Sequence, residues 1–328
     1  MKDKQLDTEN EELLVLKDVK TSFFTKKGVV RAVDGVNFTI SKGEVVGLVG
    51  ESGCGKSITS LSIMRLVPQP AGKIVSGEIL FKNEDLLKKS EDEMRRIRGD
   101  RISMILQDPM VSMNQLLKVG YQLGEPYRYH HKVSGSLREM CIGLLKKVKV
   151  PAPESRVNDY PFQFSGGMCQ RALIAMGIAN GPDLLIADEP TTALDVTIQA
   201  QILKLMKDIQ RESRSSIILI THDLATVAQI CSRLLVMYGG RIIEKAPVKT
   251  FYKKPAHPYS VGLIKSVPVL GRPSGRLYSI DGQPPSLLDP PSGCRFAPRC
   301  TQAKKPCFEI YPPETILEEG HKVSCWLY

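Results

Sequence analysis

The run from Gly50 to Ser57 carries the clearest chemical signal in the sequence. It reads Gly-Glu-Ser-Gly-Cys-Gly-Lys-Ser and fits the pattern G-x-x-x-x-G-K-[ST] of a phosphate-binding loop, or P-loop. Its glycines allow backbone N–H groups to surround phosphate oxygens, and the helix expected after it adds a partial positive charge. Lys56 is expected to reach the β- and γ-phosphates, and the Ser57 hydroxyl to ligate Mg²⁺. We expect the following residues to contact the nucleotide: Gly50, Ser52, Gly53, Cys54, Gly55, Lys56, Ser57 and Ile58.

Two further candidate sites follow apolar runs. Asp188 and Glu189 come directly after the run 184–187, where one carboxylate can serve Mg²⁺ and the other can polarise an attacking water. His222 follows the run 217–220. Each feature alone has an ordinary explanation, a solvated strand end or a structural histidine. The P-loop in the same chain favours a catalytic role for the carboxylates, whereas the role of His222 depends on a further motif described below.

The elements that must position these residues alternate along the chain. The apolar runs are typical of strands buried on both faces of a parallel sheet, and they lie at 45–49, 184–187 and 217–220. Stretches compatible with helices follow them at 56–66, 195–212 and 223–231. This alternation predicts an α/β fold, and in such folds ligands bind beyond the carboxyl ends of the strands. The candidate residues all lie there, so we expect one shared site.

Length and composition exclude several classes of protein. The 328 residues correspond to about two domains at ~150 residues each, and 42% hydrophobic with 24% charged residues is typical of a globular chain rather than a disordered one. We find no membrane-spanning run and no signal peptide, so we expect a cytoplasmic location. Twelve of the 22 prolines fall in residues 255–328. This bias predicts a body of residues 1–254 and a loop-rich tail of residues 255–328.

A glycine-rich helix start supplies the last motif. Phe164-Ser165-Gly166-Gly167-Met168 opens a helix-compatible stretch at 169–180, with Ser165 suited to cap the helix and two glycines that leave N–H groups free for an anion. This segment resembles the signature motif of the ATP-binding-cassette (ABC) ATPases. Over roughly residues 12–250 the family's motifs occur in the family's order, with Gln107 between the P-loop and the signature and Asp195 after Asp188-Glu189.

The resemblance to ABC ATPases implies a P-loop ATPase cassette with an antiparallel β subdomain and a helical subdomain at about 110–178. It implies ATP as the nucleotide, Glu189 as general base, Gln107 and His222 as groups that contact the γ-phosphate, and Asp195 as the D-loop aspartate. The implied catalytic set is Lys56, Gln107, Glu189 and His222, and the implied Mg²⁺ set is Ser57, Gln107 and Asp188.

The same resemblance implies that cassettes act in pairs. The signature residues Ser165, Gly166 and Gly167 would then cover ATP held on the P-loop of the partner cassette. Phe23 is similar to the aromatic residue that stacks on adenine in this family, and Phe24 is the alternative.

The tail narrows the resemblance. His257-Pro258-Tyr259, Gly282-Gln283-Pro284-Pro285 and the segment from Gly293 to Cys300 look like the C-terminal extension of dipeptide and oligopeptide importer ATPases. The tail also holds Cys294, Cys300, Cys307 and Cys325, without the C-x₂₋₄-C spacing of zinc ribbons. Such thiolates are compatible with a [4Fe–4S] cluster, which some members of that family carry. Zn²⁺, unligated cysteines and mixed ligation with His321 are the alternatives.

The importer resemblance implies two membrane-spanning permease subunits and a second ATPase subunit, either a homologue or another copy of this chain. It also implies an extracytoplasmic solute-binding protein that acts indirectly, with the chain at the cytoplasmic face of the cell membrane. Dipeptides, oligopeptides and nickel complexes all remain possible solutes. The net charge of +10 raises the alternative of an ABC ATPase that acts on nucleic acid or ribosomes. We expect no nucleic-acid partner, because the chain has one cassette and no sustained heptads, and a basic surface also suits an anionic membrane.

Overall fold

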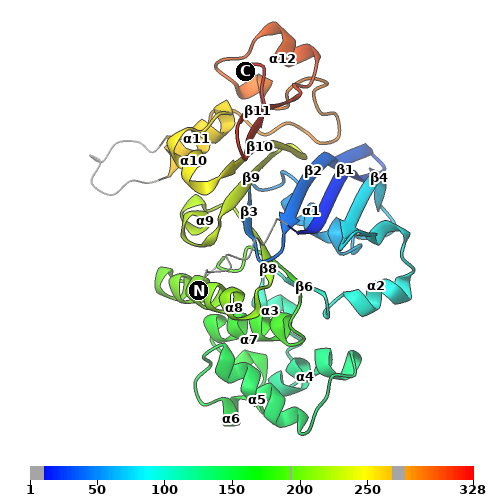
Figure 1. Ribbon diagram of the computed structural model, residues 1–328, viewed down its shortest axis with the longest axis vertical. Helices are drawn as coiled ribbons and strands as arrows, with labels where there is room; N and C mark the ends of the chain where they lie inside the picture. Colours follow the sequence, from blue (N-terminus) through cyan, green and yellow to red (C-terminus); the bar gives the residue numbers. More distant parts are fainter. Residues whose placement is uncertain (1–10, 193, 268–277) are drawn as a thin grey trace, which may run out of the picture.

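An eight-stranded sheet forms the centre of the computed structural model, which describes residues 11–192, 194–267 and 278–328 (Figure 1). Its strand order is β11-β12-β10-β9-β3-β8-β7-β6. The strands β9, β3, β8, β7 and β6 run parallel to one another, and the remaining pairs are antiparallel. The parallel strands are β3 (Val45–Val49), β6 (Ile102–Ile105), β7 (Leu184–Asp188), β8 (Ser216–Thr221) and β9 (Arg233–Tyr238).

The three predicted strands are confirmed as the neighbours β3, β8 and β7. Every residue of β7 and β8 is buried, which is why these segments lack a polar face. The predicted helices are also confirmed, as α1 (Lys56–Ile63), α8 (Val196–Ser213) and α9 (Leu224–Ile230). The carboxyl ends of β3, β7 and β8 therefore bring the P-loop, the Asp-Glu pair and His222 to one edge of the sheet.

A second, antiparallel sheet confirms the predicted β subdomain. Its order is β2-β1-β4-β5. Its strands are β1 (Glu12–Thr25), β2 (Gly28–Ser41), β4 (Gly72–Phe81) and β5 (Glu84–Asp85), followed by the short helices η1 (Leu86–Lys88) and α2 (Glu91–Ile97). Leu14 and Ile40 of this sheet share one buried apolar cluster with Leu48 and Ile218 of the central sheet, so the two sheets pack on a common core.

Helices fill the chain between β6 and β7, at the lower end of the molecule in Figure 1. They are α3 (Pro109–Ser112), α4 (Val119–Tyr129), α5 (Leu137–Lys147), α6 (Pro153–Arg156), η2 (Pro161–Gln163) and α7 (Gly166–Ile178). Their apolar sides pack into one cluster with Leu185 and Leu219 of the central sheet. The helix expected from residue 169 begins at Gly166, because Ser165 caps it by accepting a hydrogen bond from the Met168 N–H at 3.3 Å.

The tail continues the central sheet. The body ends with β10 (Arg241–Pro247) and α10 (Val248–Lys253), and the elements of the tail are α11 (Pro258–Ser266), η3 (Ala297–Arg299), α12 (Lys305–Glu309), β11 (Glu314–Glu318) and β12 (His321–Ser324). Strand β12 pairs with β10 in the register Glu244 to Val323, and β11 forms the sheet edge. Residues 278–296, which precede η3, contain no helix or strand, in keeping with their prolines, and the boundary after residue 254 stays a prediction. No described helix is long and apolar enough to cross a membrane.

Candidate functional site

The P-loop joins β3 to α1 in a conformation that requires its glycines. Gly50, Gly53 and Gly55 have φ of 157°, 76° and 108°. A Cβ on Gly50 would lie 2.2 Å from the Met237 carbonyl oxygen, and one on Gly55 would lie 2.3 Å from the carbonyl oxygen of Ala32. Any residue other than glycine would therefore clash with a backbone carbonyl at both positions.

The Lys56 ammonium is buried beneath this loop. It donates to the carbonyl oxygens of Gly50 at 2.8 Å and Glu51 at 2.9 Å. Ser52, Gly53 and Ser57 are exposed on the same loop, whereas Ile58 packs against the core between the two sheets. A polar surface for an incoming phosphate is thus present beside a cation that the loop itself holds in place.

Asp188 supplies the clearest ligand for Mg²⁺. Its Oδ1 atom is buried and has no hydrogen-bond partner among the described residues. The pKa of this carboxyl is raised, because burial and the neighbouring Glu189 carboxylate outweigh the Ser57 hydroxyl and the Lys56 ammonium, which lower it. A buried carboxylate oxygen with a free lone pair beside a hydroxyl is a donor set that suits Mg²⁺, so the residues fit the metal that the P-loop predicts.

Three side chains from separate loops converge on the Glu189 carboxylate. Gln107 Nε2 donates to its Oε2 atom at 3.0 Å, Thr192 Oγ1 donates to the same oxygen at 2.9 Å, and His222 Nδ1 lies 3.1 Å from Oε1. Burial would raise the pKa of Glu189, but the hydrogen bonds from His222 and Thr192 outweigh it and the pKa is lowered. The carboxylate is therefore ionised at neutral pH and can accept a proton from water.

Glu189 also adopts an unusual backbone conformation. Its φ of 47° lies in the left-handed region, which a side chain other than glycine rarely occupies. Strained conformations of this kind persist where neighbouring structure holds them, and here the Glu189 N–H donates to the Ile220 carbonyl at 2.9 Å. The sequence prediction included Gln107 and His222 but missed Thr192, whose only signal was its place three residues after the Asp-Glu pair.

The signature residues lie beside the start of α8. A Cβ on Gly167 would meet the Ile198 side chain at 2.9 Å, and one on Gly166 would lie 3.8 Å from Leu194. Asp195 caps α8 by accepting from the Ile198 N–H at 2.9 Å. Gly166, Gly167 and Asp195 thus all lie next to the first turn of α8, and their roles toward a partner cassette stay predictions.

The two candidate adenine-stacking residues differ in exposure. Phe23 is half-buried, and its ring lies 2.9 Å from the place of a Cβ on Gly72. Phe24 is 49% exposed, with the Lys73 ammonium 5.8 Å from its ring centroid. Both lie near the end of β1, and the choice of Phe23 over Phe24 stays a prediction.

The four tail cysteines come together from separate segments. The Cys294 N–H donates to the Cys307 carbonyl at 2.8 Å, and burial raises the pKa of Cys294 to about 11, with further contributions from the Cys325 and Cys307 thiols. All eight cysteines of the chain are free. No group of three or more His, Cys, Asp or Glu side chains within residues 11–192, 194–267 and 278–328 is placed to hold a metal ion. The thiols as arranged therefore do not fit a cluster or Zn²⁺ without movement.

His321 has a different partner from the one the sequence suggested. Its Nε2 atom lies 2.9 Å from Oε1 of Glu244, and both side chains are almost fully buried. Glu244 also accepts the N–H groups of Ala256 and His257, each at 2.8 Å. The pair joins β12 to β10 and to the turn before α11, which accounts for a buried histidine without metal ligation.

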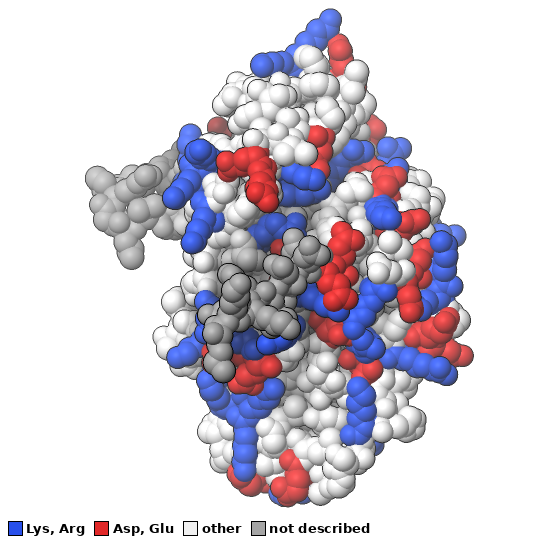
Figure 2. All heavy atoms as spheres, in the orientation of Figure 1, with Lys and Arg blue, Asp and Glu red and all other residues white. Residues whose placement is uncertain are grey.

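Charges of both signs are mixed over the visible face of the molecule (Figure 2). Lysines and arginines lie beside aspartates and glutamates there, rather than in one basic stripe. This distribution lacks the clustered basic surface typical of nucleic-acid binding on that face.

Comparisons with known proteins agree with this geometry. Residues 33–192 match the family described as ABC transporter, and residues 243–307 match the family described as oligopeptide/dipeptide transporter, C-terminal region. The dipeptide transport ATP-binding protein DppD of Bacillus subtilis (strain 168) is 52% identical over 97% of this chain and 95% of its own length. The oligopeptide transport ATP-binding protein OppD of the same strain is 51% identical over 96% of this chain and 88% of its own length.

Solved structures match the cassette part of the chain. A dimeric post-hydrolysis state of the ATP-binding cassette MJ0796, bound to ADP and Pi, has a TM-score of 0.65 and 28% identity, covering 72% of this chain and 99% of that one. The cbiO1 protein from Clostridium perfringens, part of the transporter complex cbiONQ, has a TM-score of 0.61 and 25% identity, covering 77% of this chain and 95% of that one.

Proposed function

The chain belongs to the family of ATP-binding subunits of peptide ABC transporters, and from this premise we propose the roles of its individual residues. Its activity is the ATP hydrolysis that powers peptide import. The observation that carries the residue assignment is the carboxylate of Glu189, held by Gln107, Thr192 and His222 beside the P-loop. In our proposal this carboxylate takes a proton from the water that attacks the γ-phosphorus, and the bond from that phosphorus to the β-phosphate oxygen breaks.

The remaining P-loop residues position the triphosphate. Lys56 exchanges its bonds to the loop carbonyls for bonds to the β- and γ-phosphates, and exposed backbone N–H groups of the loop bind the other oxygens. Ser57, Asp188 and Gln107 would hold Mg²⁺, which supplies charge neutralisation at the phosphates. In our proposal His222, whose side chain is 61% exposed, contacts the γ-phosphate.

Substitution of Glu189 by Gln tests this assignment. Glu189→Gln keeps the size and most hydrogen bonds of the side chain but removes its basicity, so we expect ATP to bind as before while hydrolysis falls by roughly 10²- to 10⁴-fold. Glu212→Gln, on the exposed end of α8, is the matched control and should hydrolyse ATP at the wild-type rate. Wild-type turnover in Glu189→Gln would show that another group accepts the proton.

Pairing of cassettes is part of the proposal. Two related structures are dimers of the cassette MJ0796, and one of them is bound to ADP and Pi. In this chain Ser165 to Gly167 would cover ATP on a second cassette, either a homologue or another copy of the chain. Nucleotide then acts as a ligand that binds the closed pair better than the open one, which favours closure.

The segment after Gln107 is our proposed contact with the membrane-spanning permease subunits. Met110, Val111 and Leu116 expose large apolar side chains there, as does Leu106 just before Gln107, and Leu116 is 84% exposed. Exposed apolar groups gathered beside a catalytic loop are typical of an interaction surface. Contact at this place would put the chain at the cytoplasmic face of the membrane, with a solute-binding protein acting through the permease.

We also propose that the tail cysteines bind iron as a [4Fe–4S] cluster, with Zn²⁺ as the alternative. Support comes from the donor set, which is four unpaired thiols brought together by the fold. The thiols must move to ligate a cluster. Anaerobic purification followed by iron, sulfide and zinc analysis tests this proposal, with Cys231→Ser as control because that thiol lies outside the tail. Protein that contains neither iron nor zinc would contradict it.

A further inference from the structure

A salt bridge joins the tail to the P-loop. Arg299 Nη1 lies 3.0 and 3.2 Å from the two carboxylate oxygens of Glu51, the second residue of the P-loop. The Arg299 side chain is only 6% exposed. Its other bonds go to the Tyr238 hydroxyl at 3.1 Å and to the carbonyl oxygens of Asp281 and Ile280 at 2.9 and 3.1 Å. A guanidinium with this many fixed partners is a rigid anchor for the carboxylate that it binds.

Glu51 contacts both the tail and Lys56. Its carboxylate bonds to Arg299, its N–H donates to the Tyr259 hydroxyl at 2.9 Å, and its carbonyl accepts from Lys56 at 2.9 Å. Tyr259 belongs to α11 and is fully buried. Both the side chain and the backbone of one P-loop residue are therefore held by residues from after residue 254.

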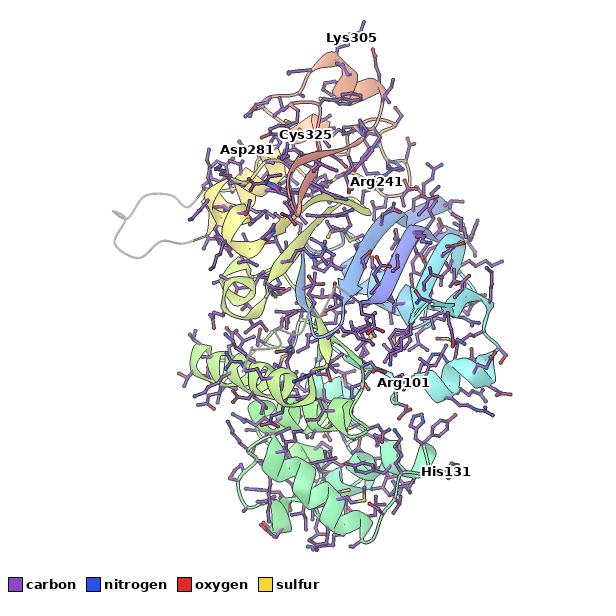
Figure 3. All side chains as sticks on the ribbon, viewed as in Figure 1. Arg101, His131, Arg241, Asp281, Lys305 and Cys325 are labelled. Atoms are coloured by element: carbon purple, nitrogen blue, oxygen red, sulfur yellow. The ribbon has the colours of Figure 1, made fainter. Side chains whose placement is uncertain are left out.

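A second connection runs through the turn between β9 and β10. Buried Arg295 donates to the Gly239 carbonyl and pairs with Asp34, and the Gly240 N–H donates to the Cys54 carbonyl of the P-loop at 2.8 Å. Figure 3 places Arg241, which also pairs with Asp34, between the tail and the β-subdomain strands. Arg295 and Arg299 lie within one short stretch of the tail. This stretch is connected to the P-loop directly through Arg299 and indirectly through Arg295 and the β9–β10 turn.

Apolar tail residues complete the contact. Pro284, Pro285 and Leu287 line the same small cavity as Glu51 and Ser52. The Leu287 carbonyl accepts the N–H of Arg31 on β2 at 2.8 Å. The outer side of the P-loop is thus covered by the tail, while its exposed residues stay open to the nucleotide.

We propose that Arg299 is a positioning residue that sets the affinity of the P-loop for ATP. This inference rests on the proposed function, in which the P-loop binds ATP. The loop binds phosphate through backbone N–H groups, and its glycines give that backbone many conformations unless something holds it. The Arg299–Glu51 pair holds the loop in one conformation before ATP arrives. The loop therefore loses less conformational entropy when ATP binds.

The test uses the full chain and five variants, of which Lys56→Ala is described last. We would measure equilibrium binding of radiolabelled ATP with Mg²⁺ for wild type, Arg299→Met, Glu51→Gln and the double variant, together with the thermal midpoint of each protein without nucleotide. Arg95→Met is the matched control, since its partner Asp92 lies on the same exposed helix at 3.5 Å. Hydrogen exchange at the P-loop amides of each variant reports the loop order directly.

We expect Arg299→Met and Glu51→Gln each to raise the Kd for ATP roughly ten-fold, and the double variant to raise it no further, because the two residues act as one unit. Arg95→Met should bind as wild type does. P-loop amides should exchange faster in both single variants. If Arg299→Met does not fold, Glu51→Gln decides the question, because it leaves every other bond of Arg299 in place.

An unchanged Kd in a folded Glu51→Gln protein would overturn the inference, and so would a lower thermal midpoint with wild-type affinity, which marks a role in folding alone. Lys56→Ala separates this failure from failure of the proposed function. Wild type that binds no ATP contradicts the proposed function. If wild type binds ATP, Lys56→Ala does not bind it and Glu51→Gln still binds it, then only the positioning role of Arg299 is contradicted.

Discussion

Gln107 and Glu189 lie 82 residues apart in the chain, and Gln107 Nε2 donates to Glu189 Oε2 at 3.0 Å. Gln107 opens the exposed segment that we assign to the permease contact, and Glu189 is our proposed general base. One hydrogen bond therefore connects the surface that faces the transporter to the group that activates water. A shift of Gln107 on docking would change how the carboxylate is held.

Removal of the Gln107 amide should slow hydrolysis more than it weakens ATP binding. In Gln107→Ala, Glu189 keeps Thr192 and His222 but loses one fixed donor, so its oxygens are less well oriented. We expect kcat to fall roughly ten-fold, since one oriented hydrogen bond is worth about 1–1.5 kcal/mol, and the Kd for ATP to rise by a smaller factor, since Ser57 and Asp188 would still hold Mg²⁺. Steady-state hydrolysis and equilibrium binding check this, with the exposed tail variant Gln302→Ala as control. A large loss of ATP binding with normal kcat would contradict the role.

Ser165 is expected to have two separable effects, as a helix cap and as a signature residue. Ser165→Ala should lower the free energy of unfolding by ~1 kcal/mol and should also reduce hydrolysis. Ser136→Ala is a close match, because Ser136 caps α5 by the same bond to the third residue of its helix. That variant should lose similar stability and keep its hydrolysis rate. Urea unfolding and ATPase assays on both proteins make the comparison, and equal hydrolysis in the two would argue against a signature role.

The acid stability of the protein should depend on Asp34. Burial would raise the pKa of Asp34, but the hydrogen bond and charge of Arg241 and the charge of Arg295 outweigh it and lower the pKa. A lowered pKa contributes stability above the unfolded value of ~3.9, and that contribution is lost as the pH falls through the folded value. Asp34→Asn should therefore be less stable than wild type at pH 7, and the difference should shrink below about pH 4.

Urea unfolding from pH 7 downward measures this difference, with exposed Asp92→Asn as the control. The control should follow wild type at every pH. A difference between Asp34→Asn and wild type that stays constant through the acid range would mean that Asp34 titrates alike in the folded and unfolded states.

Loss of Glu244 should destabilise the attachment of the tail. Its buried carboxylate serves His321 and two backbone N–H groups, and Glu244→Ala leaves all three without that partner. We expect a loss of about 3–5 kcal/mol, comparable to breaking a buried ion pair. Glu318→Ala on the edge strand β11 should cost less than about 0.5 kcal/mol, as is usual for surface sites. Denaturant unfolding followed by fluorescence of Trp326, in the tail, reports the change.

The parts of the fold that could be predicted depend on local sequence. Continuous apolar runs located β3, β7 and β8, because strands covered on both faces carry no polar side. The glycines of the P-loop and the cap at Ser165 are local requirements of backbone geometry, so they too were predictable.

What could not be predicted depends on residues that meet only in the folded chain. The pairing of β12 with β10 and the bond of Arg299 to Glu51 join segments 77 to 248 residues apart, and no periodicity in the sequence encodes them. Thr192 carried no signal beyond its position. The order of motifs predicted a catalytic set, which stays a prediction, whereas the choice between Phe23 and Phe24 depends on how a strand end is packed.

The left-handed backbone conformation of Glu189 is unfavourable for stability, yet Glu189 is the residue that we propose as general base. Glycine would occupy that conformation with about 1 kcal/mol less strain, but Glu189→Gly would also remove the contacts with Gln107, Thr192 and His222 and give the unfolded chain greater freedom. A laboratory evolution campaign that screened for heat resistance alone would place no demand on the basicity of the residue that we propose as general base. Any thermostable version of this ATPase should be selected on transport at the same time.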